Sequence, residues 1–196
     1  MGAREEILAR VRASMPPAQP LPPELSAGAQ YDDPRAQFVK SLASVGGASL
    51  DVRGPIEDAL ASLPAYGAAR SIASLVPGVK RANFDLGAVT DPHQARDVDF
   101  CVLPGELGVA ESGAIWITNH GGIARSVAFL AQHLAIVLPA TSIVHNLHEA
   151  YRRIAIPRPG FGVFISGPSK TADIEQSLVI GAHGARSCIV LITPAP

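Results

Sequence analysis

Residues 161–184 contain the side chains whose types and spacing most clearly suggest chemistry. A continuous apolar stretch, FGVFISG, is followed by GPSKT, and the pattern predicts a helix over the next residues, TADIEQSLVIG. At the start of a helix, free backbone N–H groups and the positive end of the helix dipole lie together, which favours a bound anion. The Ser169 and Thr171 hydroxyls and the Lys170 ammonium would add hydrogen-bond donors. We therefore predict that the loop from Gly167 to Thr171 binds a small anion.

The same segment has a second interpretation. The spacing of the glycines up to Gly167 imitates a nucleotide-binding P-loop, but Pro168 stands where that loop needs its lysine, which excludes a Walker-type ATPase. A purely structural role is also open, in which Thr171 caps the helix while Asp173 and Glu175 complement its dipole. Capping and binding are compatible, and Asp173 stays a candidate ligand-binding residue.

Other polar residues are weaker candidates. Asn119 begins the sequence NHGG, whose glycines would let the backbone approach a ligand, and Arg125 could bind a carboxylate there; a plain β-turn is the alternative. His183 follows the predicted helix and either joins the anion site or interacts with the helix C-terminus. His145 and His148 lie three residues apart, but they match no metal motif and lack a third ligand, so we predict no metal site.

The composition excludes several classes of function. Sixteen lysines and arginines against 17 acidic residues give a net charge of −1, so no broad cationic surface would hold nucleic acid or anionic lipid. Cys101 and Cys188 each lie in an apolar, β-branched stretch typical of a core. Because an iron–sulfur cluster needs about four thiolates, this chain would bind none through cysteine, and no cofactor is identified. Without a signal peptide or an apolar stretch of roughly 20 residues, we expect a cytoplasmic protein.

The chain divides into three parts. Residues 1–14 predict a short amphipathic helix, and residues 15–34 contain six prolines, which are typical of a linker. Such an arm could pack on another subunit, so a homo-oligomer is open. Residues 35–196 are expected to form one domain.

In that domain, strand and helix patterns alternate, which is typical of an α/β sheet. The first predicted elements are a helix, a strand and a helix, over PRAQFVKSLASVGG, ASLDVRG and PIEDALASL. Short β-rich pieces joined by glycine turns follow in residues 98–119 and predict a hairpin insertion. The remainder predicts strand, helix, strand, helix and strand, over HLAIVLPATSIV, HNLHEAYRRI, FGVFISG, TADIEQSLVIG and RSCIVLITP.

Three motifs resemble the LutC/YkgG family, whose domain is called LUD. The string GPSKTADIE, followed by a glycine and then by His183 and Gly184, resembles the C-terminal signature of the family. The sequence AESGA at residues 110–114 resembles a family segment that precedes a strand. His133 falls where the family commonly has a histidine ahead of its central strand. The resemblance covers about residues 98–193, whereas the N-terminal half matches only in the order of its elements.

The resemblance implies both a fold and a setting. The implied fold is similar to the NagB/RpiA/CoA-transferase-like group, a three-layer α/β sandwich with a mostly parallel sheet. The implied setting is a system that oxidises L-lactate to pyruvate and whose other members are iron–sulfur proteins. Electrons would then pass through these partner proteins, which agrees with the small number of cysteines.

Glu111 gains interest from the same resemblance. In related CoA transferases, a glutamate that precedes a small residue and a glycine near a hairpin attacks an acyl thioester. Ser112 and Gly113 could supply the required space and N–H donors. Glu111 could instead contact a ligand, or accept a hydrogen bond within a turn.

Three functional hypotheses follow. In the first, the chain is a cluster-free component of L-lactate oxidation, and a cleft at the carboxyl ends of the strands, between the Glu111 segment and the Gly167 loop, binds a small anion. In the second, the chain is a free-standing acyl or CoA transferase that uses Glu111. In the third, it is a non-catalytic scaffold for iron–sulfur partners.

Overall fold

Five parallel strands form the central sheet of the computed structural model, which describes residues 2–17, 19–20, 28–118, 125–155, 160–174 and 177–194. The strand order is β1-β11-β6-β3-β2. The three inner strands, β11, β6 and β3, have apolar sequences because both faces of a parallel sheet are buried there. The bounds, in that order, are Ala48–Asp51, Ser187–Thr193, His133–Pro139, Phe100–Pro104 and Ile72–Ser74.

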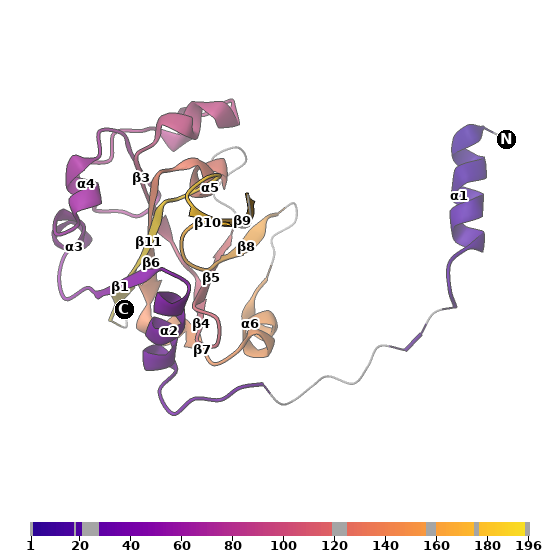
Figure 1. Ribbon diagram of the computed structural model, residues 1–196, viewed down its shortest axis with the longest axis horizontal. Helices are drawn as coiled ribbons and strands as arrows, with labels where there is room; N and C mark the ends of the chain where they lie inside the picture. The colour runs from indigo at the N-terminus through magenta and orange to yellow at the C-terminus, as the bar shows by residue number, and fades with distance from the viewer. Residues whose placement is uncertain are drawn as a thin grey trace.

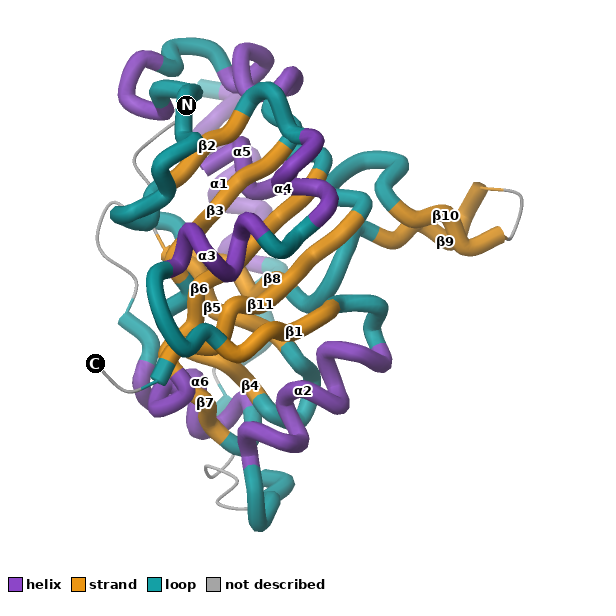
Figure 2. Tube along the Cα trace, turned by 90° about the vertical axis from the view of Figure 1, so that its left-hand side faces the viewer, coloured by secondary structure: helices purple, strands orange, loops and turns teal. Residues whose placement is uncertain are grey.

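Short helices cover one face of this sheet, as Figure 2 shows. They are α3 (Ile56–Ala61) and α4 (Pro64–Ala68), and Leu60 and Tyr66 pack there against Phe100. Two short 3₁₀ helices, Leu86–Ala88 and Pro92–Asp97, follow before β3 begins.

A second sheet packs on the opposite face, in the order β7-β4-β5-β8. Its strands are Ile143–Val144, Leu107–Val109, Ala114–Thr118 and Gly162–Ile165. Helices α2 (Pro34–Ser44) and α5 (Val127–Leu130) also contribute buried residues to this layer. Helix α6 (Leu147–Arg153) packs against the second sheet through Ala150.

The predicted fold class is confirmed: the chain is a mixed α/β protein with a mostly parallel central sheet. The hairpin expected in residues 98–119 exists as the antiparallel pair β4–β5, but it belongs to the larger second sheet. The first piece of the expected insertion is wrong, because Phe100–Pro104 forms β3 of the central sheet, parallel to β2 and β6. The stretch HLAIVLPATSIV, predicted as one strand, turns at Ala140–Ser142 and supplies both β6 and β7. Strand β8 pairs antiparallel with β5 instead of joining the central sheet.

The helix predicted over TADIEQSLVIG is wrong. Those residues form the hairpin of β9 (Lys170–Ile174) and β10 (Ser177–Ile180), in which Lys170 pairs with Ile180 and Thr171 with Val179. Threonine, isoleucine and valine favour strands, and pairing between the two halves outweighs the weak helical preference of the residues between them. The predicted helix N-terminus beside Gly167 therefore does not exist.

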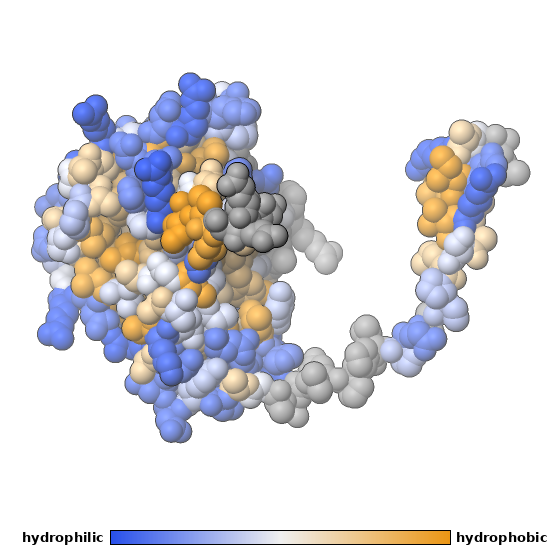
Figure 3. Space-filling view, viewed as in Figure 1, coloured by the Kyte–Doolittle hydropathy of each residue, from blue (hydrophilic) through white to orange (hydrophobic). Residues whose placement is uncertain are grey.

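Helix α1 (Ala3–Ala13) forms as predicted but lies apart from the other elements (Figure 1). It buries no residue, and its apolar side chains, such as Ile7 at 62% exposure, face solvent (Figure 3). The division into arm, linker and domain stays a prediction. No helix in the described ranges is long and apolar enough to cross a membrane.

Candidate functional site

The loop after β8 is fixed by close packing against the end of α2. Gly167 has a φ of +72°, and a Cβ atom there would lie 2.7 Å from the Val45 carbonyl oxygen. Only glycine combines this backbone conformation with so close a contact. The loop that the sequence singled out is therefore closely packed at Gly167, although the strand β9 follows it instead of a helix.

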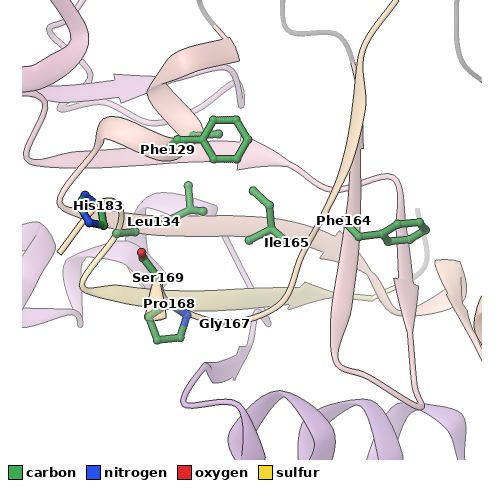
Figure 4. A pocket seen from close by; sticks show the side chains of 11 residues that line it. Phe129, Leu134, Phe164, Ile165, Gly167, Pro168, Ser169 and His183 are labelled. Atoms are coloured by element: carbon green, nitrogen blue, oxygen red, sulfur yellow. The ribbon is translucent and has the colours of Figure 1, made fainter. Parts of the chain in front are cut away.

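A pocket of about 230 Å³ lies beside this loop (Figure 4). Three of the residues predicted to bind a ligand, Gly167, Ser169 and His183, line it. Most of its wall is apolar, formed by Ala128, Phe129, Leu134, Phe164, Ile165, Pro168, Gly184 and Ala185. Figure 4 shows Ser169 and His183 toward one end, with Ile165 and Phe164 toward the other.

The backbone of Ser169 is already hydrogen-bonded within the protein. Its N–H donates to the Ala185 carbonyl oxygen at 2.9 Å, and its carbonyl accepts from the Gly181 N–H at 2.9 Å. This amide is therefore unavailable to an anion, whereas the Ser169 hydroxyl and the His183 ring are side-chain groups that could bind a ligand here. Gly184 keeps space beside that hydroxyl, because a Cβ there would lie 3.2 Å from Ser169 Oγ.

The other predicted loop residues point elsewhere. Lys170 is exposed, and its Cε lies near Gly46, at 3.8 Å from where a Cβ of that residue would be. Thr171 is half-buried on β9 opposite Val179. Asp173 lies on the same strand, and its side chain is outside the described part of the structure. Neither Lys170 nor Thr171 lines the pocket among the described residues.

The pocket also lies at the other end of the central strands from the one that we predicted. It is lined by Leu134, the second residue of β6, and by Ala185, which precedes β11. These are the amino-terminal ends of parallel strands, so the expectation of a cleft at their carboxyl ends is wrong for this pocket. The expectation treated β8 as a strand of the central sheet, whereas β8 is antiparallel to β5 in the second sheet.

Glu111 lies in the turn between β4 and β5 and supports α6. Its Oε1 accepts a hydrogen bond from the N–H of Leu147, the first residue of α6, at 3.0 Å. Its own N–H donates to the His145 carbonyl at 3.1 Å. A carboxylate at a helix N-terminus is stabilised by the unpaired N–H groups and the dipole. This bond gives Glu111 a structural role, and its proposed nucleophilic role stays a prediction.

The Glu111 turn and the Gly167 loop touch without forming one cleft. Ser166 Oγ donates to the Ser112 carbonyl oxygen at 2.8 Å, which joins the two segments. Gly113, with a φ of +64°, packs its Cα on the backbone of α2 at Leu42. Neither Glu111 nor Gly113 is among the described residues that line the pocket.

The remaining predicted site residues lie at the margin or outside the description. Asn119 falls outside the described residues. The Arg125 guanidinium lies 5.3 Å from the centre of the Phe161 ring, which itself stands edge-on to Phe129 at 6.4 Å between ring centres. Arg125 therefore does not line the pocket itself, but contacts Phe161, which in turn contacts the pocket residue Phe129.

The sequence interpretation missed a second pocket of about 250 Å³ at the same sheet edge. It is lined by Asp99, Gln132, His133 and Arg186, together with Ala65, Ala68 and Ala69 of the α4 region. Its polar residues all precede or begin an apolar strand. Because parallel strands begin at one edge of a sheet, this shared position was a signal that could have brought the residues together.

The two thiols are buried, and His145 is engaged within the protein. Cys101 and Cys188 are buried, and burial raises the pKa of both thiols, that of Cys188 to about 12. His145 Nδ1 accepts the Tyr31 N–H at 3.0 Å. Within the residues that the structure describes, no three His, Cys, Asp or Glu side chains gather as metal ligands.

Comparisons with known proteins point to one family. A match to the LUD domain covers residues 90–193. Lactate utilization protein C of Shouchella clausii is 33% identical over 105 residues, which cover 50% of this chain and 46% of that protein. The protein of the same name from Bacillus subtilis is 33% identical over 95 residues, which cover 45% and 40%. The chain thus matches less than half the length of these relatives.

A solved structure resembles the whole fold. The crystal structure of a DUF162 family protein from Deinococcus radiodurans covers 83% of this chain, and 96% of that chain is matched. The TM-score is 0.57 at 15% sequence identity, so the similarity is one of fold.

Proposed function

The chain belongs to the LUD domain family, and from this membership we propose that it is a cytoplasmic, cluster-free component of a system that oxidises L-lactate to pyruvate. The observation that carries the proposal is the similarity to proteins named for lactate utilization. The LUD domain match, residues 90–193, contains every residue that lines the pocket beside Gly167. Half of the chain lies in that similarity, so the setting is inferred from the domain.

The pocket beside Gly167 suits a small carboxylate with a short apolar tail. Ser169 and His183 provide hydrogen-bonding groups at one end, and Leu134 and Phe129 provide apolar surface. A carboxylate could accept from the hydroxyl and the imidazole, while a methyl group would contact the apolar wall. The donors are side chains, in contrast to the helix amides that the sequence led us to expect.

Partner proteins are part of the proposal. Oxidation of lactate to pyruvate releases two electrons, and both cysteines of this chain are buried in the core. We infer that iron–sulfur proteins accept the electrons, since such clusters require cysteine ligands that this chain lacks.

Ligand binding in the pocket is tested by titrating the protein with L-lactate and pyruvate and following backbone amide signals by NMR. Shifts at Gly167 and Gly184, weakened in Ser169→Ala and in His183→Ala, support the proposal. His93→Ala is the matched control, because His93 is exposed, interacts with Asp91, and is not among the residues that line the pocket. Unchanged Gly167 and Gly184 signals at millimolar ligand would refute binding there.

Participation in the oxidation is tested with purified iron–sulfur partners encoded beside this chain. L-lactate-dependent dye reduction that requires the chain, and falls in Ser169→Ala and His183→Ala, supports an active component. If turnover requires the chain but is unchanged in both variants, the pocket beside Gly167 takes no part in the oxidation.

A further inference from the structure

Polar residues gather where three neighbouring central strands begin. Asp99 precedes β3, His133 begins β6, and Arg186 precedes β11. His133 is in register with Phe100 on one side and with Ser187 on the other. The 250 Å³ pocket lies between these strand ends and the alanines of the α4 region.

His133 is held in a defined orientation. Its Nδ1 lies 2.8 Å from Ser187 Oγ, and its ring stacks on Phe100 at 6.3 Å between ring centres. Burial and the nearby Arg186 lower the pKa of His133, partly offset by Asp99, so the imidazole is neutral near pH 7. Nε2 makes no hydrogen bond to any residue that the structure describes, which leaves it available to a ligand.

Asp99 is a fixed carboxylate. Its Oδ2 accepts hydrogen bonds from the N–H groups of Arg70, at 2.8 Å, and Ser71, at 3.0 Å. These bonds lower the pKa of Asp99, so the side chain is ionised at neutral pH. Oδ1 forms no hydrogen bond with the described part of the chain and can accept one from a bound molecule.

Arg186 supplies the positive charge on the other side of His133. Its backbone N–H donates to the Gln132 carbonyl oxygen at 2.8 Å. Its Cγ packs on Gly181, where a Cβ added to the glycine would lie only 2.4 Å from that Cγ. The stem of the side chain is therefore fixed. Arg186 lines the pocket, and its positive charge is near enough to help lower the pKa of His133. Its guanidinium forms no ion pair with a carboxylate in the described ranges.

We propose that this pocket binds a small carboxylate that carries a hydrogen-bond donor on the adjacent carbon, that is, a 2-hydroxy or 2-amino acid. The guanidinium of Arg186 would bind the carboxylate. An ammonium group could donate to both Asp99 Oδ1 and His133 Nε2, whereas a hydroxyl, with one hydrogen, would donate to one of them. The alanine methyl groups leave room for a short side chain.

This site is separate from the pocket beside Gly167. Successive residues of a strand face opposite sides of a sheet. Leu134 and Ala185 line the Gly167 pocket, whereas their neighbours His133 and Arg186 line the pocket under α4. The pocket under α4 therefore uses side chains that take no part in the pocket beside Gly167. Binding at one pocket can be disproved without affecting the other.

Three ligands of similar size test the proposal by calorimetry and amide NMR: L-lactate, L-alanine and propionate, which lacks the donor. We expect L-lactate or L-alanine to shift the Ser71 and Arg186 amides, and the tighter of the two identifies the donor as hydroxyl or ammonium. Propionate should bind at least about tenfold more weakly, because Asp99 and His133 would lose their partner. No shift with any ligand, or equal affinity for propionate, would overturn the proposal.

Variants then assign the binding groups. Arg186→Gln keeps the Cγ that packs on Gly181 and should weaken binding about tenfold or more, whereas Arg152→Gln on α6 removes the same charge and should not. His133→Asn keeps a nitrogen near the position of Nδ1 for Ser187 and loses Nε2, so it should also weaken binding. Full affinity in Arg186→Gln would overturn the proposal. Loss of binding only in Ser169→Ala would do the same while leaving the Gly167 pocket supported.

Discussion

Gly113 offers a quantitative test of how the turn that carries Glu111 is held. Its φ of +64° is a conformation that residues with a Cβ adopt at a cost of about 1–2 kcal/mol. A Cβ at this position would also lie 2.5 Å from the backbone nitrogen of Leu42 and 2.6 Å from its Cα. These are backbone atoms of α2, so relief requires the helix or the turn to shift, which costs about 1–3 kcal/mol.

Gly113→Ala should therefore lower the free energy of unfolding by about 2–5 kcal/mol. For a chain of this size, that change corresponds to a melting temperature about 4–20 °C lower. Urea titration at 25 °C with circular dichroism, accompanied by a thermal melt, measures both quantities.

Two other glycines separate the contributions. Gly78 also has a positive φ, +84°, but a Cβ there would meet nothing within 4 Å, so Gly78→Ala should cost only about 1–2 kcal/mol. Gly67 lies in α4 with open space around it, and Gly67→Ala should stabilise the protein by about 0.5–1 kcal/mol. If Gly113→Ala costs no more than Gly78→Ala, the turn is not packed on α2 as described.

Further predictions concern Glu111, the thiols and Asp99. Glu111→Gln should lower the free energy of unfolding by about 1 kcal/mol, because the Leu147 N–H loses a charged acceptor; an acyl-CoA mass adduct on the wild-type chain that is absent from the variant would contradict a purely structural Glu111. Cys101 and Cys188 should react with a thiol reagent only after denaturation, because burial raises both pKa values; rapid native labelling would disprove this. Hydrogen bonds lower the folded-state pKa of Asp99, so its contribution to stability is present above about pH 4 and is lost as the pH falls below that value; in Asp99→Asn the urea midpoint should depend less on pH in this range.

The inner strands β11, β6 and β3 were recognisable as strands because their sequences satisfy the burial of both sheet faces without reference to partners. The short edge strand β2, Ile72–Ser74, was not expected. The apolar stretches FCVLP and CIVLIT needed only their β-branched residues and length to be recognised. Helix α2 was similarly evident from Phe38 and Leu42, which share one face and are fully buried.

The β9–β10 hairpin was not predictable in the same way. Its residues carry a mixed pattern, and pairing of Thr171 with Val179 stabilises the strands only once the chain reverses between them. The local pattern also gave no indication that β8 would pair with β5 through Trp116 and Phe164. Both errors moved the expected anion site onto a helix end that does not form.

The candidate site was predicted in part. Gly167, Ser169 and His183 do meet around one pocket, whereas Glu111 is engaged with α6 at Leu147. Glu111 lies apart from the pocket because of the path that the β4–β5 turn takes in space, and the spacing of residues along the chain does not reveal this path. The pocket under α4 required the strand order as well, because its residues come from three separate segments.

The role in L-lactate oxidation is tested most directly in extracts of the host after deletion of the gene for this chain. The rate of L-lactate-dependent dye reduction should fall to background and return when the purified chain is added. An extract without the chain that oxidises L-lactate at the parental rate would contradict the proposed function.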